Sequence, residues 1–287
     1  MFIFVGIGIV MFCSFGAYIM FGGNIGIIAH ALPKEMMMIG GVALGATIVA
    51  NPTFLLKRFV GGIKAIIKGP HHDKDSFLEL LTLLYTLFKM IKTKGILSIE
   101  AHIEKPEESE LFKKFPHFMH DHHAPTFLCD YLRMWTLGTD NHHELESIID
   151  LELETHHQEE EQVSGAIQNL ADGLPAIGIV AAVLGVIKTM GSINQPPPIL
   201  GGMIGGALVG TFLGVFLAYG IFGPMAAHLK TIHAMDGKYY LAIKAALLAH
   251  MQGYAPSVSV EFARKGLVSH LRPSFFEVEE ACSKVTL

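Results

Sequence analysis

One stretch of 57 residues, from 173 to 229, contains a single formal charge, on Lys188. The segment 194–198, with the sequence Asn-Gln-Pro-Pro-Pro, interrupts it near its middle, and segments of this kind are typical of turns. A helix needs about 20 apolar residues to cross a hydrocarbon core about 30 Å thick. The stretch therefore predicts two membrane-spanning helices joined by a short turn.

A second pair of apolar segments lies at the N-terminus, where residues 1–33 and 36–56 carry no formal charge. Charged residues make up 16% of the chain, against about 25% in soluble proteins, and the mean hydropathy is +0.44. We expect an all-α membrane protein with four transmembrane helices in two hairpins and a helical cytoplasmic domain. The predicted boundaries are 1–22, 34–55, 173–191 and 199–222 for the spans, 23–33 for a periplasmic loop, 192–198 for a periplasmic turn, 56–172 for the cytoplasmic domain and 223–287 for a cytoplasmic tail.

The distribution of basic residues predicts the orientation. Of 21 Lys and Arg residues, 12 lie between Pro52 and Gly173 and seven lie beyond Gly223. Because basic residues mark the cytoplasmic side of a membrane protein, both polar parts and both termini are expected in the cytoplasm. The net charge of −5 and the lack of a basic stripe argue against nucleic-acid binding.

The cytoplasmic parts show helical periodicity. Apolar residues recur at helical spacing from Phe77 to Ile91, which predicts an amphipathic helix with Glu79, Lys89 and Lys92 off its apolar stripe. Further helices are expected at 144–163 and 238–251, and no segment alternates convincingly like a strand. A helical bundle is therefore the predicted architecture.

Titratable residues are scarce in the predicted spans. A protein that moves protons through hydrocarbon ordinarily keeps an Asp, Glu or His inside a span, because so costly a group is tolerated only for function. We expect no Asp or Glu in the core of any span, and only Lys188 and His30 near the outer ends. The titrating carboxylate of any ion path would then come from another chain.

Small residues and prolines mark the third and fourth spans. Gly202, Gly206, Gly210 and Gly214 recur every four residues and form a smooth face suited to close helix packing or to a partner helix. Pro175 and Pro224 lie near the cytoplasmic ends of the spans, where they either end helices or act as hinges. Thr211 is the one hydroxyl deep in the fourth span, and a bond to its own helix would also explain it.

The chain has sixteen histidines, some of them clustered. Their spacing fits no common metal-ligand pattern, and adjacent histidines on a helix point to different faces. We expect a solvated surface that is weakly sensitive to pH, no metal or other cofactor, and no enzymatic activity. The clusters are His120, His122 and His123, then His142 and His143, then His156 and His157.

Several longer segments resemble the MotA family of flagellar motor stator subunits, part of the MotA/TolQ/ExbB proton channels. Residues 172–186, DGLPAIGIVAAVLGV, resemble the family's third span, and 209–214, VGTFLG, with 217–220, LAYG, resemble the fourth. The cytoplasmic segments that resemble the family are 154–156 (ETH), 253–256 (GYAP) and 272–275 (RPSF). The resemblance covers almost the whole chain.

The resemblance implies a homo-oligomeric ring, expected to be a pentamer, around a MotB dimer in the bacterial inner membrane. MotB would bring the proton-carrying Asp, and proton flow would turn the ring against the rotor protein FliG. It also implies roles for individual residues. These are Thr211, Ala182 and Gly210 on the ion path, Pro175 and Pro224 in conformational coupling, and Lys92, Glu100 and Glu152 at the rotor.

The same resemblance bears on the coupling ion. Sodium-driven relatives carry extra threonines near the ion site, where this chain has Ala182 and Gly210. Sodium needs several oxygen ligands, whereas a proton needs one carboxylate and a hydrogen-bonded path. The sequence thus predicts proton coupling.

Three alternatives remain open. An energy transducer of the ExbB or TolQ type would have three spans in a different order. The second alternative is a passive scaffold or a self-sufficient transporter. A transporter should contain a charged residue or a broken helix within its own membrane spans. A membrane enzyme using the histidines is the third, and it would hold stoichiometric metal.

Overall fold

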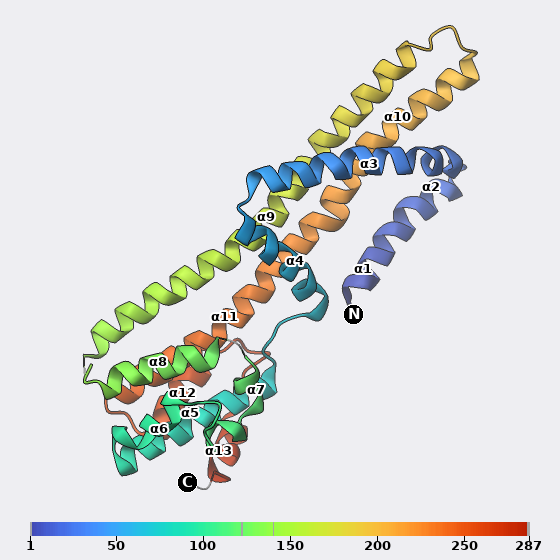
Figure 1. The fold of residues 1–287 in the computed structure, drawn as a ribbon. Coiled ribbons are helices and arrows are strands. Elements are labelled where there is room, and N and C mark those ends of the chain that lie inside the picture. Colours follow the sequence, from blue (N-terminus) through green and yellow to red (C-terminus); the bar gives the residue numbers. More distant parts are fainter. Residues whose placement is uncertain (1, 122, 140, 286–287) are drawn as a thin grey trace. The chain divides into compact units, whose positions relative to one another are not determined.

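The computed structural model describes residues 2–121, 123–139 and 141–285, and the elements in these ranges are helices, without a strand (Figure 1). The chain divides into two compact units. Unit 1 comprises Met1–Gly69 and Glu159–Ile232, and unit 2 comprises Pro70–Gln158 and His233–Leu287. Two long helices, α9 (His142–Met190) and α11 (Gly223–Met251), contribute to both units.

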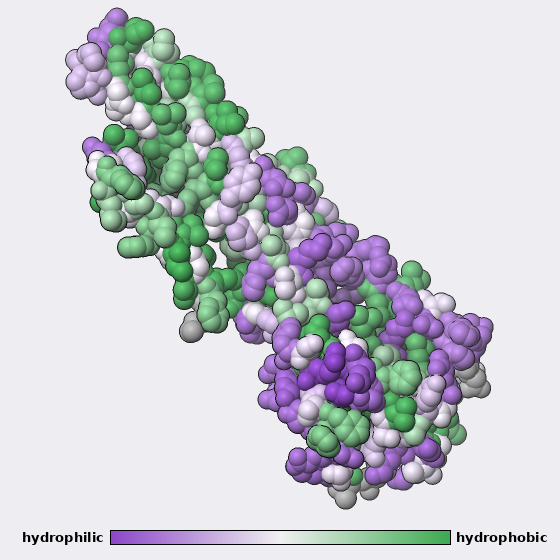
Figure 2. Space-filling view, turned by 180° about the vertical axis from the view of Figure 1, so that it is seen from behind, coloured by the Kyte–Doolittle hydropathy of each residue, from purple (hydrophilic) through white to green (hydrophobic). Residues whose placement is uncertain are grey.

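Unit 1 contains the apolar segments. Four helices of the described chain are long and apolar enough to cross a membrane, which confirms the predicted fold class. Figure 2 shows hydrophobic side chains gathered over the surface of these segments and hydrophilic ones over unit 2. The four helices are Phe2–Met20 (α1, Phe2–Met11; a π-helical turn, Phe12–Gly16; α2, Ala17–Met20), α3 (Ile25–Ala50), α9, and Pro197–Met251 (α10, Pro197–Leu217; a π-helical turn, Ala218–Phe222; α11).

The helices are longer than the sequence predicts. Residues 25–33, expected in a loop, form the start of α3, and the Asn24 side chain accepts a hydrogen bond from the Gly26 amide at its N-terminus. Pro33 lies inside this helix. A backbone in lipid must satisfy its own hydrogen bonds, which favours continuing the helix over opening a loop.

α3 ends at Ala50, where Asn51 and Pro52 are extended, and α4 (Thr53–Lys68) follows. α4 packs in unit 1 through Leu55 and Ile66, which form a buried cluster with Val163, Ala226 and Leu229. Arg58 Nη1 lies 2.7 Å from a carboxylate oxygen of Glu159. The cluster and the ion pair join α4 to the parts of α9 and α11 that belong to unit 1.

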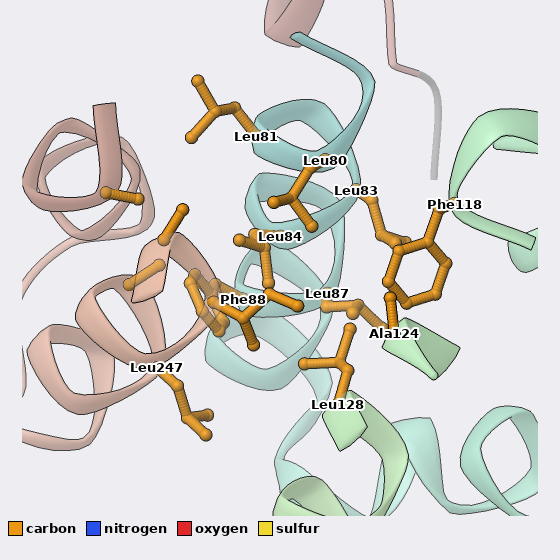
Figure 3. Close-up of a cluster of buried hydrophobic side chains, with 14 of the residues drawn as sticks. Leu80, Leu81, Leu83, Leu84, Leu87, Phe88, Phe118, Ala124, Leu128 and Leu247 are labelled. Carbon is orange, nitrogen blue, oxygen red and sulfur yellow. The ribbon is translucent and has the colours of Figure 1, made fainter. Parts of the chain in front are cut away.

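Unit 2 is built around α5 (Lys74–Lys94). Leu80, Leu84, Leu87 and Phe88 are fully buried in its core, together with side chains of α7, α8 and α11 (Figure 3). The sequence predicts one apolar stripe on this helix, but Leu83 is also fully buried. The further helices of unit 2 are α6 (Glu100–Glu104), α7 (Pro116–His120), α8 (Ala124–Thr136), α12 (Pro256–Gly266) and α13 (Phe275–Ser283), with short 3-10 turns at Ile96–Ile99 and Phe112–Lys114.

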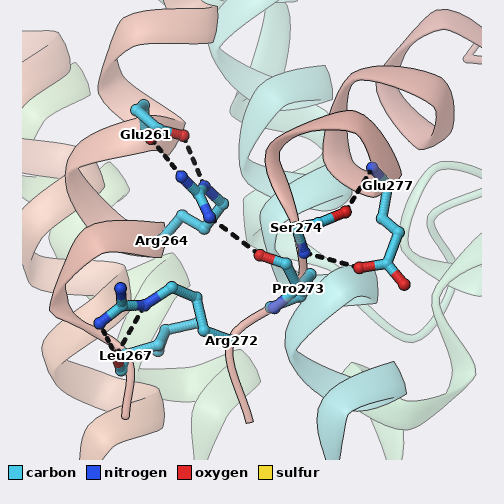
Figure 4. Close-up of polar contacts among 7 residues, drawn as sticks. All are labelled: Glu261, Arg264, Leu267, Arg272, Pro273, Ser274 and Glu277. Carbon is cyan, nitrogen blue, oxygen red and sulfur yellow. Dashed lines mark hydrogen bonds and ion pairs between the residues drawn. The ribbon is translucent and has the colours of Figure 1, made fainter. Parts of the chain in front are cut away.

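A buried arginine joins α12 to the segment before α13 (Figure 4). The Arg264 guanidinium donates to the Glu261 carboxylate and to the Pro273 carbonyl oxygen, the latter at 3.0 Å. Ser274 and Glu277 form a reciprocal capping box at the start of α13. Segment 272–275, which resembles the family, therefore holds α12 and α13 together through Pro273 and Ser274.

Two histidines that the sequence analysis did not single out are buried in unit 2. The His72 ring stacks on Tyr239, with centroids 3.7 Å apart, and its Nε2 lies 3.3 Å from Asp121. The His250 ring stacks on Phe88, and burial lowers its pKa. The clustered histidines are exposed or half-buried where the structure describes them, and His122 lies outside the described residues.

Candidate functional site

α9 and α10 approach backbone to backbone inside unit 1. A Cβ placed on Gly214 would lie 2.5 Å from the Leu174 carbonyl oxygen and 2.9 Å from Gly178 Cα. A Cβ placed on Gly178 would lie 2.7 Å from the Gly210 carbonyl oxygen. Only glycine fits these two positions, because the opposing atoms belong to the main chain and cannot turn aside.

The glycines nearer the start of α10 have more room. A Cβ on Gly206 would make an ordinary contact of 3.9 Å with Ala31 of α3, and one on Gly202 would meet no atom within 4 Å in the described chain. Among the four glycines of α10, Gly214 and Gly210 therefore make the close contacts, and the role predicted for Gly202 stays a prediction.

Gly210 and Ala182 meet at this junction. A Cβ on Gly210 would lie 3.4 Å from the Ala182 amide nitrogen and 3.0 Å from the Ala181 Cβ. Its closest contact, at 2.6 Å, would be Oε2 of Glu35 in α3. Three helices thus converge at Gly210, for which the family resemblance predicts a place on the ion path.

Glu35 corrects the expectation that no span holds a carboxylate in its core. It lies inside α3, ten residues after Ile25, and only 8% of its surface is exposed. Its Oε2 has no hydrogen-bond partner among the described residues. The sequence does not indicate that Glu35 is buried in a span, because the predicted span begins at residue 34 and Glu35 then lies at the edge of the apolar run.

A cavity of about 620 Å³ adjoins this carboxylate. Residues of α3, α9 and α10 line it, and its titratable side chains are His30, Lys34, Glu35 and Lys188. Gly206 and Thr189 also face it. The cavity therefore brings Lys188 of α9 together with three titratable groups of α3 in a space large enough for several water molecules.

Thr211 follows Gly210 in α10 and is half-buried. Its hydroxyl makes no hydrogen bond within the described chain, whereas Thr47 and Thr189 bond to the carbonyls four residues earlier, at 2.8 and 2.9 Å. A hydrogen bond from the Thr211 hydroxyl to a carbonyl of its own helix therefore does not explain this residue.

Neither proline ends its helix. Pro175 lies inside α9, and Pro224 is the second residue of α11. The π-helical turn Ala218–Phe222 ends two residues before Pro224 and widens the helix where the proline lacks an N–H. The chain therefore has two weakened backbone positions at which helices can bend.

The charged residues predicted at the rotor lie in unit 2. Lys92 is exposed in the last turn of α5, and Glu100 is exposed at the start of α6. Gly95 joins the two helices with φ of +84°, a conformation that favours glycine. Neither charge has an ion-pair partner in the described residues, so both are free to meet another molecule.

Glu152 has a different environment. Its carboxylate accepts a hydrogen bond from the hydroxyl of Tyr131, whose surface is 2% exposed. Burial and this hydrogen bond raise the pKa of Tyr131. Glu152 therefore satisfies a buried hydroxyl of unit 2, in addition to any role on the surface.

Comparison with known proteins agrees with the predicted resemblance. A family model described as Motility protein A N-terminal matches residues 4–95, and one described as the MotA/TolQ/ExbB proton channel family matches residues 120–236. The chain is 40% identical over 280 residues to Motility protein A of Salmonella typhimurium, covering 98% of this chain and 94% of that protein. It is 32% identical over 277 residues to Chemotaxis protein LafT of Vibrio parahaemolyticus, covering 96% of each.

Two solved structures share the fold. One is that of C. jejuni MotAB, with a TM-score of 0.74 and 19% identity, covering 93% of this chain and 95% of that chain. The other is the flagellar MotAB stator complex from Bacillus subtilis, with a TM-score of 0.72 and 22% identity, covering 97% and 98%. The chain has four helices that are apolar enough to cross a membrane, and it is 40% identical to Motility protein A of Salmonella typhimurium over 98% of its length. The chain therefore belongs to the motility protein A family.

Proposed function

We propose that this chain is the ring-forming stator subunit of a bacterial flagellar motor. With MotB it forms a proton-conducting complex in the inner membrane, and ion flow is converted into torque on the rotor protein FliG. Five copies surround the MotB dimer, and both termini of this chain lie in the cytoplasm. The observation that carries the proposal is the 40% identity to Motility protein A over nearly the whole chain.

The α9 and α10 junction supports this function. Gly210 and Ala182, which the family resemblance places on the ion path, are neighbours there, and the hydroxyl of Thr211 is not used by its own helix. With Ala182 and Gly210 in place of threonines, the junction offers few oxygen ligands for sodium, which favours the proton as the coupling ion. The match of residues 4–95 to the Motility protein A N-terminal model favours this reading over an ExbB or TolQ transducer.

Torque would pass from unit 1 to the rotor through two features. Bending of α9 at Pro175 and of α11 at Pro224 would couple proton binding to movement of the helices that continue into unit 2. The exposed charges of Lys92 and Glu100 would then steer contact with FliG. Lys has no planar fork for gripping carboxylates, so Lys92 acts as a point charge.

Proton uptake into vesicles tests the proposal. The chain is incorporated alone and together with a MotB-like protein of the same genome, in its natural form and with its membrane Asp changed to Asn. We expect uptake only with both chains and only with the intact Asp. Uptake by this chain alone would contradict the proposal and favour a self-sufficient transporter.

The rotor contact is tested separately in cells that lack their own stator. Lys92→Glu and Glu100→Lys should each reduce swimming while leaving the amount of MotB that purifies with the chain unchanged. Lys105→Glu is the matched control, because Lys105 is exposed and its ion pair in the described chain is with its neighbour Glu108, at 3.1 Å. Normal swimming by both charge-reversed variants would remove these residues from the rotor contact.

A further inference from the structure

Glu35 is a buried acid that the fold does not explain. Its side chain is 92% buried inside α3, and no described group donates a hydrogen bond to its Oε2. A carboxylate oxygen without a hydrogen-bond partner is destabilising in a low-dielectric site, and such groups in membrane spans are kept for function. A packing role would be served better by an apolar residue of the same size.

Glu35 lies between a cavity and the junction of α9 with α10. On one side lies the cavity of about 620 Å³, which residues at the start of α3, the end of α9 and the start of α10 line. In the proposed topology these helix ends face the periplasm. On the other side lies Gly210, whose missing side chain leaves room for the carboxylate next to Ala182. Glu35 therefore lies between the outer cavity and the junction that the proposed function assigns to the ion path.

We propose that Glu35 is a proton-binding residue of the ion path, which takes up each translocated proton from the outer cavity and passes it toward the membrane Asp of the partner chain. This inference rests on the proposed function. In the first step the Glu35 carboxylate accepts a proton from a hydronium ion in the outer cavity and becomes a neutral acid, which leaves a water molecule behind. In the second step it gives the proton to the ionised Asp and returns to its carboxylate form. No net charge or atom remains on the chain.

The groups that face the cavity fit this role. Lys34 and His30 come from α3 and Lys188 from α9, while α10 contributes no charge to the lining. The two lysines place positive charge on the cavity wall. They also repel metal cations from the cavity while a proton can still move along hydrogen-bonded water.

The glycine at 210 gives an independent test of the geometry. A Cβ there would lie 2.6 Å from Glu35 Oε2, so Gly210→Ala must displace the carboxylate. Gly201→Ala is the matched control, because Gly201 lies in α10 outside the cavity lining and a Cβ there would meet no described atom within 4 Å. We expect Gly210→Ala to slow proton uptake and Gly201→Ala to leave it near the wild-type rate.

The decisive experiment measures proton uptake by the complex with MotB in vesicles, as a function of external pH, for wild type, Glu35→Gln and Glu35→Asp. We expect Glu35→Gln to reduce uptake by roughly 100-fold or more, the scale of a lost proton-transfer group, with MotB still bound. Glu35→Asp should restore much of the rate with a changed pH profile. A residue that only packs would leave the pH profile of Glu35→Asp like that of wild type.

The possible outcomes separate this inference from the function on which it rests. A wild-type complex that takes up no protons, or does so without the MotB Asp, contradicts the proposed function. A conducting wild type with an equally fast Glu35→Gln, at every pH, overturns the role of Glu35 alone. If Glu35→Gln does not assemble, the pH profile of assembled Glu35→Asp decides, and a profile identical to that of wild type overturns the role.

Discussion

The two units pack their helices by different means. In unit 1 the closest approach is between main-chain atoms, at Gly178 and Gly214, and large apolar side chains such as Phe2 and Val49 are 84% and 89% exposed. In unit 2 the core consists of large side chains, with Leu84 and Phe88 fully buried. Unit 1 therefore adds backbone contact to its small side-chain clusters, whereas the core of unit 2 is one large cluster of side chains.

The difference follows from the solvent of each unit. Lipid is as apolar as leucine, so helices in it gain little by burying side chains and associate through close contact instead. In water, burying apolar surface is the dominant driving force. α9 follows both rules along its length, with Leu145 and Ile149 in the core of unit 2 and Gly178 at the backbone contact of unit 1.

The largest effect is expected where backbones touch. Gly214→Ala would place a methyl group 2.5 Å from the Leu174 carbonyl oxygen, so α9 and α10 must separate. We expect almost no motility and a severalfold lower amount of protein in the membrane. Gly202→Ala, which meets no described atom within 4 Å, is the control for an added methyl group on the same helix. If the two variants had the same motility and the same amount of protein in the membrane, backbone contact at Gly214 would not be what holds unit 1 together.

The next effect concerns the side-chain core. Leu84→Ala leaves a cavity in unit 2 and should lower its free energy of unfolding by about 2–5 kcal/mol. The one tryptophan of the chain, Trp135, lies in α8 of unit 2, so its fluorescence during urea unfolding in detergent reports on this unit. Leu137→Ala, at a position 82% exposed, should change the midpoint little. A loss below 1 kcal/mol for Leu84→Ala would mean that the core is not the main stabiliser of unit 2.

A smaller effect is expected at the buried ion pair of the tail. Arg264→Ala leaves the Glu261 carboxylate and the Pro273 carbonyl without their donor, which costs about 1–3 kcal/mol. The Trp135 fluorescence assay measures this loss. Lys284→Ala is the comparison variant in the same unit, because the Lys284 pair with Glu280 is exposed and such pairs contribute about 0–1 kcal/mol.

Much of the difference between the membrane helices of unit 1 and the side-chain core of unit 2 can be predicted from the sequence. Long uncharged runs predict the spans because the bilayer sets their length, and the helical periodicity around Leu84 predicts the core of unit 2. The glycines of α10 are visible too, but their partners are not, because the register of α10 against α9 is a tertiary property. Only the structure distinguishes Gly214, which touches a backbone, from Gly202, which does not.

The buried polar groups are the part that sequence reasoning missed. Glu35 was placed at a span edge because Lys34 precedes it, and only the continuous helix from Ile25 puts it inside. His72 lies in a short polar segment that reads as solvated, yet Tyr239 and Asp121, distant in the sequence, enclose it. Burial of this kind depends on segments far apart in the chain, for which local patterns carry no signal.

The smallest expected effect is a dependence on pH within unit 2. Burial disfavours the charge of Asp121, but the hydrogen bond with His72 and those from the amides of Ala124 and His123 outweigh it and hold its pKa well below the usual range. A carboxyl whose pKa is lowered by folding stabilises the folded state above its unfolded pKa of about 3.9, and this stabilisation is lost as the pH falls further. The difference in unfolding free energy between wild type and Asp121→Asn should therefore be largest near pH 7 and shrink toward pH 3. Asp75→Asn, at an exposed position of α5, should show no such narrowing. A constant difference for Asp121→Asn would mean that its two amide hydrogen bonds, which an asparagine can still accept, carry the stabilisation, and that its charge does not.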